Sequence, residues 1–275
     1  MKNISFQGLH GAYSEVVCKK LYKDYQTLPC NSFEDAFEAV ENSLSSLAMI
    51  PVENSLAGRV SDMHFILQNT DLKIVAEYYQ KIEHNLLVNN NVTLKDLKKT
   101  LSHSHALSQC KNEIRKLKLE PVNFIDTAGA AKFISESKDK TLSAIASSLS
   151  AKIYNLKILK KNIEDQKKNI TRFLVFSKKK KEISIKQKVK TTLVFNLNNH
   201  PASLYKVLGA FAENKINLTR LESFFVNENF KQYSFLIDVE CHVKFDSFVR
   251  AHKRLQEFST YNKILGCYPS LNSRS

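Results

Sequence analysis

Four short segments combine turn or strand residues with side chains that could bind an anion or donate a proton. They are GLHGAYSE (8–15), PVENSLAG (51–58), SHSHALSQC (102–110) and NITRF (169–173). Glycine lets a backbone approach a ligand closely, and Ser14, near an expected helix N-terminus, could help hold an anion. Taken singly, each segment is also typical of an ordinary capped turn or strand entrance, so the argument depends on their combination.

The elements that would position these segments alternate along the first 177 residues. Strands are predicted at 4–6, 47–52, 73–79, 85–88, 100–102, 121–125, 142–145 and 172–177. Helices are predicted near 14–25, 32–42, 60–69, 105–118, 127–137 and 147–155, the second opened by a capping box at Ser32 and Asp35. This alternation favours an α/β fold with mostly parallel sheet. Ligands of such folds bind at the C-terminal ends of strands and near helix N-termini.

The alternation of short strands and helices changes after residue 177. Residues 178–189 interrupt the pattern and are typical of a linker. The following residues predict strands at 193–197, 216–225, 233–240 and 264–268, with helices at 204–211 and 245–255. The resulting order, βαββαβ, is the ferredoxin-like arrangement.

Bulk composition excludes several classes of protein. A chain of 275 residues suggests two domains. Its net charge of +14 is scattered, and its densest run, 178–181, reads as a solvated linker, so we expect no nucleic-acid partner. Five cysteines without a CxxC pair predict neither a disulfide framework nor a metal site. The absence of a long apolar stretch or signal peptide predicts a cytoplasmic protein without a membrane partner.

In this order and spacing the segments resemble the prephenate dehydratase family, which includes the plant arogenate dehydratases. Two further matches are DTAGAA (126–131), where the family pattern is STAxAA, and AIAS (144–147). Residues 200–223 resemble the start of an ACT regulatory domain. The resemblance covers nearly the whole chain. It implies a bilobal catalytic region, similar to type II periplasmic binding proteins, over 1–177, a linker over 178–189 and a ferredoxin-like ACT domain over 190–270. Lobe 1 would comprise 1–80 and 160–177, and lobe 2 would comprise 81–159.

The reaction implied by the resemblance is the conversion of prephenate to phenylpyruvate, CO2 and water in L-phenylalanine biosynthesis. Aromatisation drives it, so no cofactor or metal is expected. The threonine of the NITRF segment, Thr171, would assist the departing C4 hydroxyl as a general acid or hydrogen-bond donor. Arg172 could pair with a substrate carboxylate or simply hold the strand. The residues expected to bind substrate are Ser14, Asn54, Ser55, His103, Gln109, Thr127, Arg172 and Phe173.

The resemblance also implies L-phenylalanine as an effector and a homodimer or tetramer formed through the ACT domains. The effector-binding residues would be Ala202, Ser203, Leu204, Asn217, Leu218, Glu222 and Ser223. The chain departs from the family at three places. Where the family usually has SHPQAL, this chain has Ser104 and His105 in place of Pro and Gln. The usual ESRP motif is replaced by ESFF at 222–225, and the usual GAL by ASL at 202–204. Catalysis is therefore better supported than regulation.

Two other functions fit parts of the sequence. An arogenate dehydratase would perform the same chemistry on the corresponding amino acid, and GAYSE and DTAGAAK resemble the plant enzymes as well as the bacterial ones. A non-catalytic bilobal sensor of small molecules would share the fold, although the intact NITRF and PVENS segments argue against it.

Overall fold

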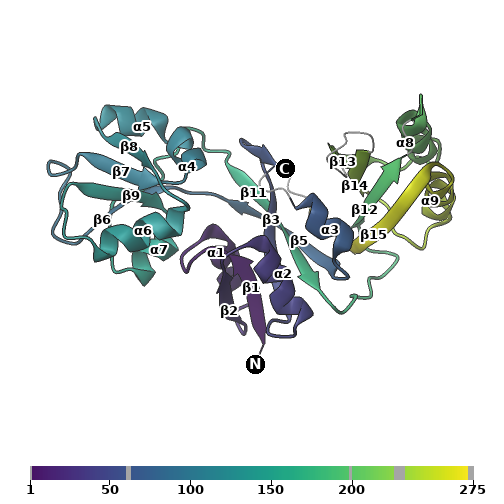
Figure 1. Cartoon of the computed structure of the whole chain (residues 1–275), viewed down its shortest axis with the longest axis horizontal. Helices are drawn as coiled ribbons and strands as arrows, with labels where there is room; N and C mark the ends of the chain where they lie inside the picture. The colour runs from purple at the N-terminus through teal and green to yellow at the C-terminus, as the bar shows by residue number, and fades with distance from the viewer. Residues whose placement is uncertain (1, 60–62, 198–199, 226–232, 272–275) are drawn as a thin grey trace. The chain divides into compact units, whose positions relative to one another are not determined.

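Three β-sheets organise the chain in the computed structural model (Figure 1). The structure describes residues 2–59, 63–197, 200–225 and 233–271. The sheets take their strands from 3–81 together with 170–177, from 85–160, and from 189–269. The predicted α/β class is confirmed, and no helix among the described residues is long and apolar enough to span a membrane.

The first sheet has the strand order β2-β1-β3-β11-β5, with β4 paired to β3. Its parallel core is the pairing of β1 with both β2 and β3. The strands are β1 (Asn3–Gln7), β2 (Gln26–Cys30), β3 (Leu47–Asn54), β4 (Gly58–Arg59), β5 (Lys73–Lys81) and β11 (Ile170–Ser177). The accompanying helices are α1 (Tyr13–Leu21), α2 (Phe33–Glu41) and α3 (His64–Asn69). The predicted capping box opens α2, where Ser32 and Asp35 satisfy each other's backbone N–H groups.

The second sheet has the order β10-β6-β9-β7-β8. Its strands are β6 (Asn85–Val88), β7 (Lys99–Ser102), β8 (Glu120–Asn123), β9 (Leu142–Ala146) and β10 (Lys157–Lys160). Its helices are α4 (Ser104–Gln109), α5 (Lys111–Lys116), α6 (Thr127–Glu136) and α7 (Ser148–Ile153). Neighbouring residues of one strand face opposite sides: Leu86 packs with α4 and α5, whereas Leu87 packs with α6 and α7. Helices therefore cover both faces of this sheet. The sheet is mixed rather than mostly parallel as predicted, because β6 pairs antiparallel with β9 and β10, whereas β7 pairs parallel with β8 and β9.

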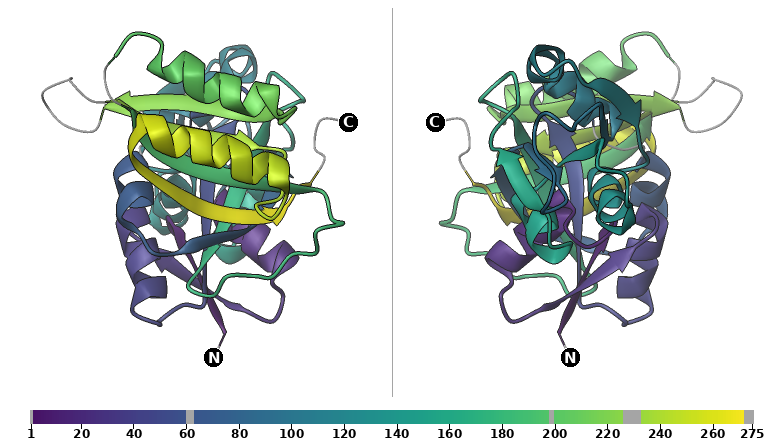
Figure 2. Two further views of the ribbon diagram at one scale, coloured as in Figure 1. Left: turned by 90° about the vertical axis from the view of Figure 1, so that its right-hand side faces the viewer. Right: turned by 90° about the vertical axis from the view of Figure 1, so that its left-hand side faces the viewer.

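The third sheet has the order β13-β14-β12-β15, which with two helices gives the predicted βαββαβ unit. The strands are β12 (Val189–Leu197), β13 (Leu218–Phe225), β14 (Tyr233–Val239) and β15 (Ser259–Pro269). The helices α8 (Ser203–Glu213) and α9 (Asp246–Phe258) lie together on one face of this sheet (Figure 2). Their apolar sides close a core around Phe195, Phe211 and Phe248.

The chain forms two compact units. One comprises Met1–Ser61 and Tyr79–Phe173, and the other comprises Asp62–Tyr78 and Leu174–Ser275. Within the second unit, Lys190 of β12 places its ammonium 3.1 Å from both carboxylate oxygens of Glu77 on β5, and both side chains are buried. The hydroxyl of Tyr261 donates to the carbonyl of Gln68 over 2.8 Å. The segment 62–78 therefore packs as part of the unit that holds the ferredoxin-like sheet.

Sequence patterns missed three strands and one helix break. β4 is two residues long and pairs with β3. β2 contains Pro29, which cannot donate to a ladder, but β2 pairs only with β1 and so tolerates it. β10 is four residues long and pairs only with β6. The single helix expected over 105–118 is two helices that meet at Cys110, whose ψ of 20° departs from helical geometry. Each error occurs where tertiary pairing overrides local preference.

Two glycines of the second unit should respond to alanine in opposite ways. A Cβ at Gly266 would lie 2.3 Å from the carbonyl oxygen of Ile74, whereas a Cβ at Gly209, within α8, would meet no atom within 4 Å. We expect Gly266→Ala to lower the free energy of unfolding by about 1–3 kcal/mol through overpacking. Gly209→Ala should raise it by about 0.5–1 kcal/mol through helix propensity. Urea unfolding of both variants checks the pair, and equal effects would contradict the close approach at Gly266.

Candidate active site

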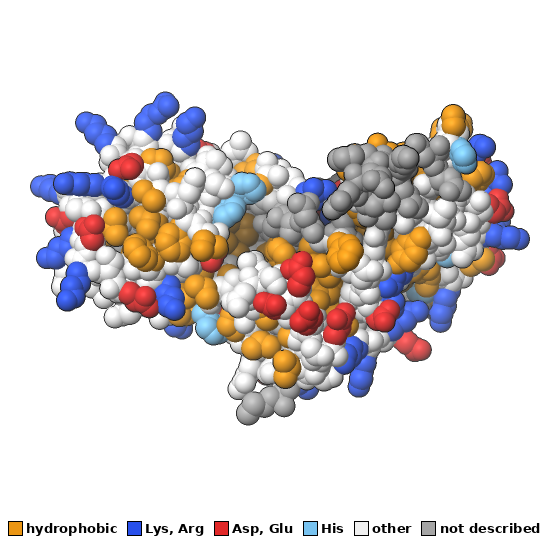
Figure 3. All heavy atoms as spheres, viewed as in Figure 1, with side chains coloured by type: hydrophobic (Ala, Val, Ile, Leu, Met, Phe, Trp, Pro, Cys, Tyr) orange, Lys and Arg blue, Asp and Glu red, His pale blue; other side chains and the backbone are white. Residues whose placement is uncertain are grey.

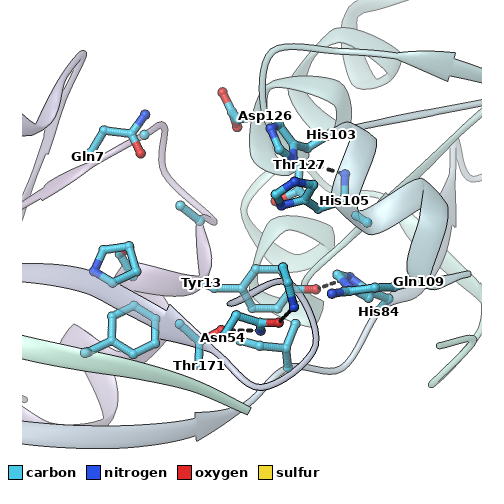
Figure 4. Close-up of a pocket in the computed structure, with 18 of the residues that line it drawn as sticks. Gln7, Tyr13, Asn54, His84, His103, His105, Gln109, Asp126, Thr127 and Thr171 are labelled. Carbon is cyan, nitrogen blue, oxygen red and sulfur yellow. Dashed lines mark hydrogen bonds between the residues drawn. The ribbon is translucent and has the colours of Figure 1, made fainter. Parts of the chain in front are cut away.

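A pocket of about 380 Å³ lies in the first unit, between the sheet built on β1, β3 and β11 and the sheet built on β7 and β9 (Figure 4). This volume suits a small organic ligand. Seven of the predicted site residues line it: Ser14, Asn54, His103, Gln109, Thr127, Thr171 and Phe173. The four motifs, separated by up to about 160 positions in the chain, therefore do meet at one cavity.

At one side of this pocket, the Asn54 side chain fixes Thr171 in place. The amide oxygen of Asn54 accepts the backbone N–H groups of Leu56 and Ala57 over 3.0 and 2.9 Å. Its amide nitrogen donates to Asn169 Oδ1 over 2.8 Å and to Thr171 Oγ1 over 2.9 Å. An amide offers two donors and an acceptor oxygen, so Asn54 has no donor left for a ligand. Because Thr171 accepts from Asn54, its own hydroxyl proton is free to point into the pocket.

A second chain of hydrogen bonds runs from Asn169 across to the other lobe. Asn169 Nδ2 donates to Gln109 Oε1 over 2.8 Å, and His84 Nε2 lies 2.9 Å from that same oxygen. A carbonyl oxygen only accepts, so His84 carries its proton on Nε2. Its Nδ1 then accepts from the Tyr13 hydroxyl 2.8 Å away, which it shares with the carbonyl of Glu83 at 3.0 Å. With its oxygen doubly engaged, Gln109 is left with its amide N–H groups as donors toward the pocket.

Burial keeps His84 and Tyr13, in this row of hydrogen bonds, uncharged. His84 is 2% exposed, and desolvation lowers its pKa from the usual value. Desolvation likewise raises the pKa of the Tyr13 hydroxyl well above its usual value, and the nearby Cys110 and acidic groups add to that shift. The Tyr13–His84 pair therefore links the two lobes of the first unit through an uncharged hydrogen bond rather than an ion pair.

The glycine turn at 8–11 is held by Glu15 and by α7. Burial opposes ionisation of Glu15, but hydrogen bonds from Gly11, His10, Thr27 and Lys19 outweigh it, and its pKa is lowered. The Gly11 N–H donates to Glu15 Oε2 over 2.6 Å. Gly11 has a φ of +94°, and a Cβ there would lie 2.5 Å from Ser150 Oγ. The conformation and the contact with α7 both require glycine.

Three helices from the two lobes direct their first residues at the pocket. Tyr13 and Ser14 open α1, His105 and Ala106 lie in the first turn of α4, and Thr127 opens α6. Of these, α1 and α6 are long enough for their N–H groups and dipoles to attract an anion. No lysine or arginine occurs among the described residues that line the pocket. The backbone N–H groups of α1 and α6 therefore supply positive partial charge at the pocket, which the lining residue Asp126 partly offsets.

His103, His105, Asp126 and Thr127 form the side of the pocket across from Thr171 (Figure 4). His103 Nδ1 accepts the backbone N–H of His105 over 3.3 Å, and the two rings meet edge to face at 5.0 Å. Burial lowers the pKa of His103, and the charge of His105 lowers it further. Figure 3 shows histidine side chains at the surface beside α4, where His105 itself is exposed.

Ser55 and Arg172 were predicted to bind substrate, but neither is among the residues that line the pocket. Ser55 Oγ donates to the carbonyl of Lys168 and accepts the N–H of Ile170, each over 3.0 Å, and so ties β3 to β11. Arg172 lies 3.7 Å from a carboxylate oxygen of Glu53 and 6.0 Å from the centre of the Tyr79 ring. Side chains alternate along a strand, so Thr171 and Phe173 face the pocket and Arg172 faces away.

Sequence reasoning missed several lining residues, of which five are polar: Gln7, Tyr13, His84, His105 and Asp126. Tyr13 and Asp126 stand inside segments already singled out, and His105 was noted as a departure. His84 stands alone at the entrance to β6, where a single histidine carries no signal without its partners.

The predicted effector-binding residues all lie in the second unit. Ala202 precedes α8 in the left-handed region, with a φ of +66°, which explains why glycine is usual there. Ser203 and Leu204 open α8, and Leu218, Glu222 and Ser223 lie on β13. Asn217 donates to Glu240 Oε2 over 2.7 Å, and Glu222 accepts from Arg220 over 2.8 Å.

Comparison with known proteins decides the family. The family model for prephenate dehydratase matches residues 4–181. The chain belongs to the prephenate dehydratase family. Its members are lyases that act on prephenate. The chain is 41% identical over 268 residues to a bifunctional N-acyl-homoserine lactone acylase/prephenate dehydratase from Komagataeibacter europaeus, covering 97% of this chain and 95% of that protein.

Two further relatives extend the comparison. Arogenate dehydratase 2 of Petunia hybrida is 38% identical over 281 residues, covering 97% of this chain and 71% of that protein. The structure of prephenate dehydratase from Arthrobacter aurescens in complex with L-Phe has a TM-score of 0.89 at 28% identity, covering 98% of this chain and 90% of that one. The bilobal catalytic region with a C-terminal ferredoxin-like unit is therefore the architecture of the family.

The buried, neutral His84 should make the protein less stable in mild acid. In the unfolded chain a histidine takes up a proton below about pH 6.5, whereas the lowered pKa of His84 delays protonation in the folded state. Between the two pKa values the unfolded state binds more protons, so stability falls as pH decreases. We expect His84→Gln to flatten the dependence of unfolding free energy on pH between 7 and 5, by up to about 1.4 kcal/mol per pH unit. An unchanged slope in urea titrations would contradict a neutral His84.

Proposed function

We propose that this chain converts prephenate to phenylpyruvate, with Thr171 as the residue that assists the leaving hydroxyl. The observation that carries this assignment is the Asn54–Thr171 hydrogen bond, in which Thr171 accepts, so that its own proton remains available to a ligand in the pocket that it lines. In the reaction, the bond between C1 and the ring carboxylate breaks to release CO2. Its electron pair moves through the ring, and the C4–oxygen bond breaks. The oxygen takes a proton and leaves as water.

Thr171 is suited to the second half of that electron flow. Hydroxide is a poor leaving group, and a donor placed at the oxygen where charge develops lowers the barrier most effectively when it is already oriented. Asn54 is 8% exposed and Thr171 7% exposed, so bulk water does not compete for the hydrogen bond between them. Phe173 is 1% exposed and gives the ring an apolar wall beside the same strand.

The two carboxylates of prephenate belong at the opposite side of the pocket. Both substituents that carry them are attached to C1, across the ring from the C4 hydroxyl. With C4 at Thr171, they point toward the N-terminus of α6, Thr127 and His103. Neutral donors there hold the dianion without the strong stabilisation that a paired arginine would give the departing carboxylate, and the nearby Asp126, whose side chain caps α6, weakens the hold further. We assign Arg172 to positioning β11 through Glu53 and Tyr79, and Ser55 to the β3–β11 connection.

The charge of the surface also suits an anionic substrate. The net charge is +14. On the face shown in Figure 3, lysine and arginine side chains are spread around α5 and β8 with acidic side chains between them. A dispersed positive field raises the encounter rate of a dianion without forming one continuous basic patch.

Substitution of Thr171 tests the catalytic assignment. Thr171→Val keeps the shape of the side chain but removes the donor, so we expect kcat to fall by about 10² or more. Thr171→Ser keeps the hydroxyl and should retain most of the activity. Phenylpyruvate formation from prephenate at neutral pH, measured against a control without enzyme, provides the readout. Equal activity in wild type and Thr171→Val would rule out this role.

We also propose that L-phenylalanine regulates the enzyme through the C-terminal unit. The Arthrobacter relative was solved in complex with L-Phe, and the ferredoxin-like unit of this chain supplies the αL turn at Ala202 and the β13 surface that the resemblance associates with the effector. Homo-oligomerisation through these units and a cytoplasmic location are parts of the same proposal.

If phenylalanine binds outside the catalytic pocket, loss of Thr171 should not prevent binding. We expect saturating L-phenylalanine to raise the melting temperature of wild type and of Thr171→Val by the same amount, because a ligand that binds only the folded state stabilises it by mass action. D-phenylalanine at equal concentration provides the control. A shift in wild type that disappears in Thr171→Val would place the ligand in the catalytic pocket instead.

A further inference from the structure

The side-chain nitrogen of Gln109 is a hydrogen-bond donor at the pocket that the reaction scheme above does not use. Gln109 Oε1 accepts from Asn169 Nδ2 over 2.8 Å and lies 2.9 Å from His84 Nε2. Among the described residues no group accepts from Gln109 Nε2, although Gln109 lines the pocket. Polar groups shielded from water normally have partners. The free N–H groups of this amide are therefore placed for a ligand.

The orientation of the Gln109 amide follows from a row of hydrogen bonds that begins at the main chain. The backbone N–H groups of Leu56 and Ala57 select the oxygen of Asn54 as their acceptor. The nitrogen of Asn54 must then face Asn169, which accepts through Oδ1. Asn169 has its nitrogen left, and only the oxygen of Gln109 can accept from it. A backbone N–H cannot become an acceptor, so each amide along the row has one favoured orientation.

His84 supplies the second hydrogen bond that holds this orientation, and it approaches from the other end of the row. Its Nε2–H donates to Gln109 Oε1, while its Nδ1 accepts from the Tyr13 hydroxyl. Its backbone N–H donates to Glu164 Oε2 over 3.0 Å, which anchors the residue just before β6. If His84 did not donate, one donor instead of two would hold the oxygen of Gln109. The amide would then turn its oxygen toward the pocket more readily.

The orientation of Gln109 matters for the oxygen that leaves the substrate. Asn169 and Thr171 accept from the same nitrogen of Asn54, over 2.8 and 2.9 Å, and Gln109 is the next residue along the row. Figure 4 shows this row at the Asn54 side of the pocket, with His103 and Thr127 at the other. An N–H group beside the leaving oxygen stabilises the negative charge that develops there, whereas a carbonyl oxygen would repel it.

We propose that Gln109 donates a second hydrogen bond to the departing C4 oxygen, and that His84 is the positioning residue that keeps the Gln109 N–H groups directed at it. The proposal rests on the proposed function and leaves its bonds unchanged: CO2 leaves C1, the electron pair moves through the ring, and the C4 oxygen leaves as water with one added proton. Gln109 transfers no proton. Because the charge on that oxygen grows in the transition state, the hydrogen bond raises kcat more than it lowers KM.

Two substitutions separate the roles of the two ring nitrogens of His84. In His84→Gln the amide nitrogen reaches the place of Nε2 and can still donate to Gln109. In His84→Asn the shorter side chain reaches the place of Nδ1, where its oxygen accepts from Tyr13 and nothing donates to Gln109. We expect His84→Gln to retain most of the activity and His84→Asn to lower kcat about tenfold, with KM within about twofold of wild type. Both variants bury a neutral amide, so a merely structural role would lower their kcat values and melting temperatures alike.

A double-mutant cycle determines whether His84 acts through Gln109. Gln109→Met removes the donor at similar side-chain length, and we expect kcat to fall by about 10² or more. In that background His84→Asn and His84→Gln should have equal kcat values, because no amide remains to be oriented. Phenylpyruvate formation from prephenate at neutral pH is the readout. Equal kcat in the two single variants would overturn the proposal, as would the same tenfold gap in the Gln109→Met background. Wild type that converts no prephenate would instead contradict the proposed function.

Discussion

The side-chain amide of Asn54 is the constraint on which the Thr171 side of the pocket depends. It accepts two backbone N–H groups of its own turn and donates to one residue on each side of Ile170. Each of its hydrogen-bonding groups therefore has a partner in the protein, and its rotamer is fixed. Fixing Asn54 also holds Thr171 Oγ1, to which it donates. Since Asn169 also holds Gln109, the same amide determines which group of Gln109 faces the ligand.

The electrostatics of the pocket follow from an absence of cationic side chains among its described lining residues. A lysine or arginine against the ring carboxylate would stabilise the ground state more than the transition state, in which that charge is lost to CO2, and would slow decarboxylation. Helix N-termini and neutral amides bind an anion more weakly. The geometry thus favours orienting the substrate over holding its charge tightly.

The sequence was sufficient to predict the elements that carry strong periodicity and the segments that meet in the pocket. It could not predict which partner each side chain would choose. Asn54 and Arg172 occur in equally specific segments. Asn54, however, directs its hydrogen bonds to neighbouring protein groups, and Arg172 faces Glu53 on the other side of the strand. His84 is invisible to pattern reasoning because its significance lies in Tyr13 and Gln109, 71 and 25 residues away. Long-range pairing decides such roles, and spacing along the chain does not encode it.

Two strands connect the chemistry to the proposed regulation. β11 carries Thr171 and Phe173 in the first compact unit and continues as Leu174–Ser177 in the second. β5 carries Glu77, which is paired with Lys190 of the ferredoxin-like sheet. The same strand enters the first unit at Tyr79. Four residues later, the carbonyl of Glu83 accepts a hydrogen bond from Tyr13, the residue that also contacts His84. An effector can change catalysis only by its difference in affinity for two states of the protein. A bound state that shifted either strand by a fraction of a hydrogen-bond length would alter the hydrogen bonds of Thr171 or those of Tyr13 and His84. Coupling through continuous strands therefore requires no movement of the pocket as a whole.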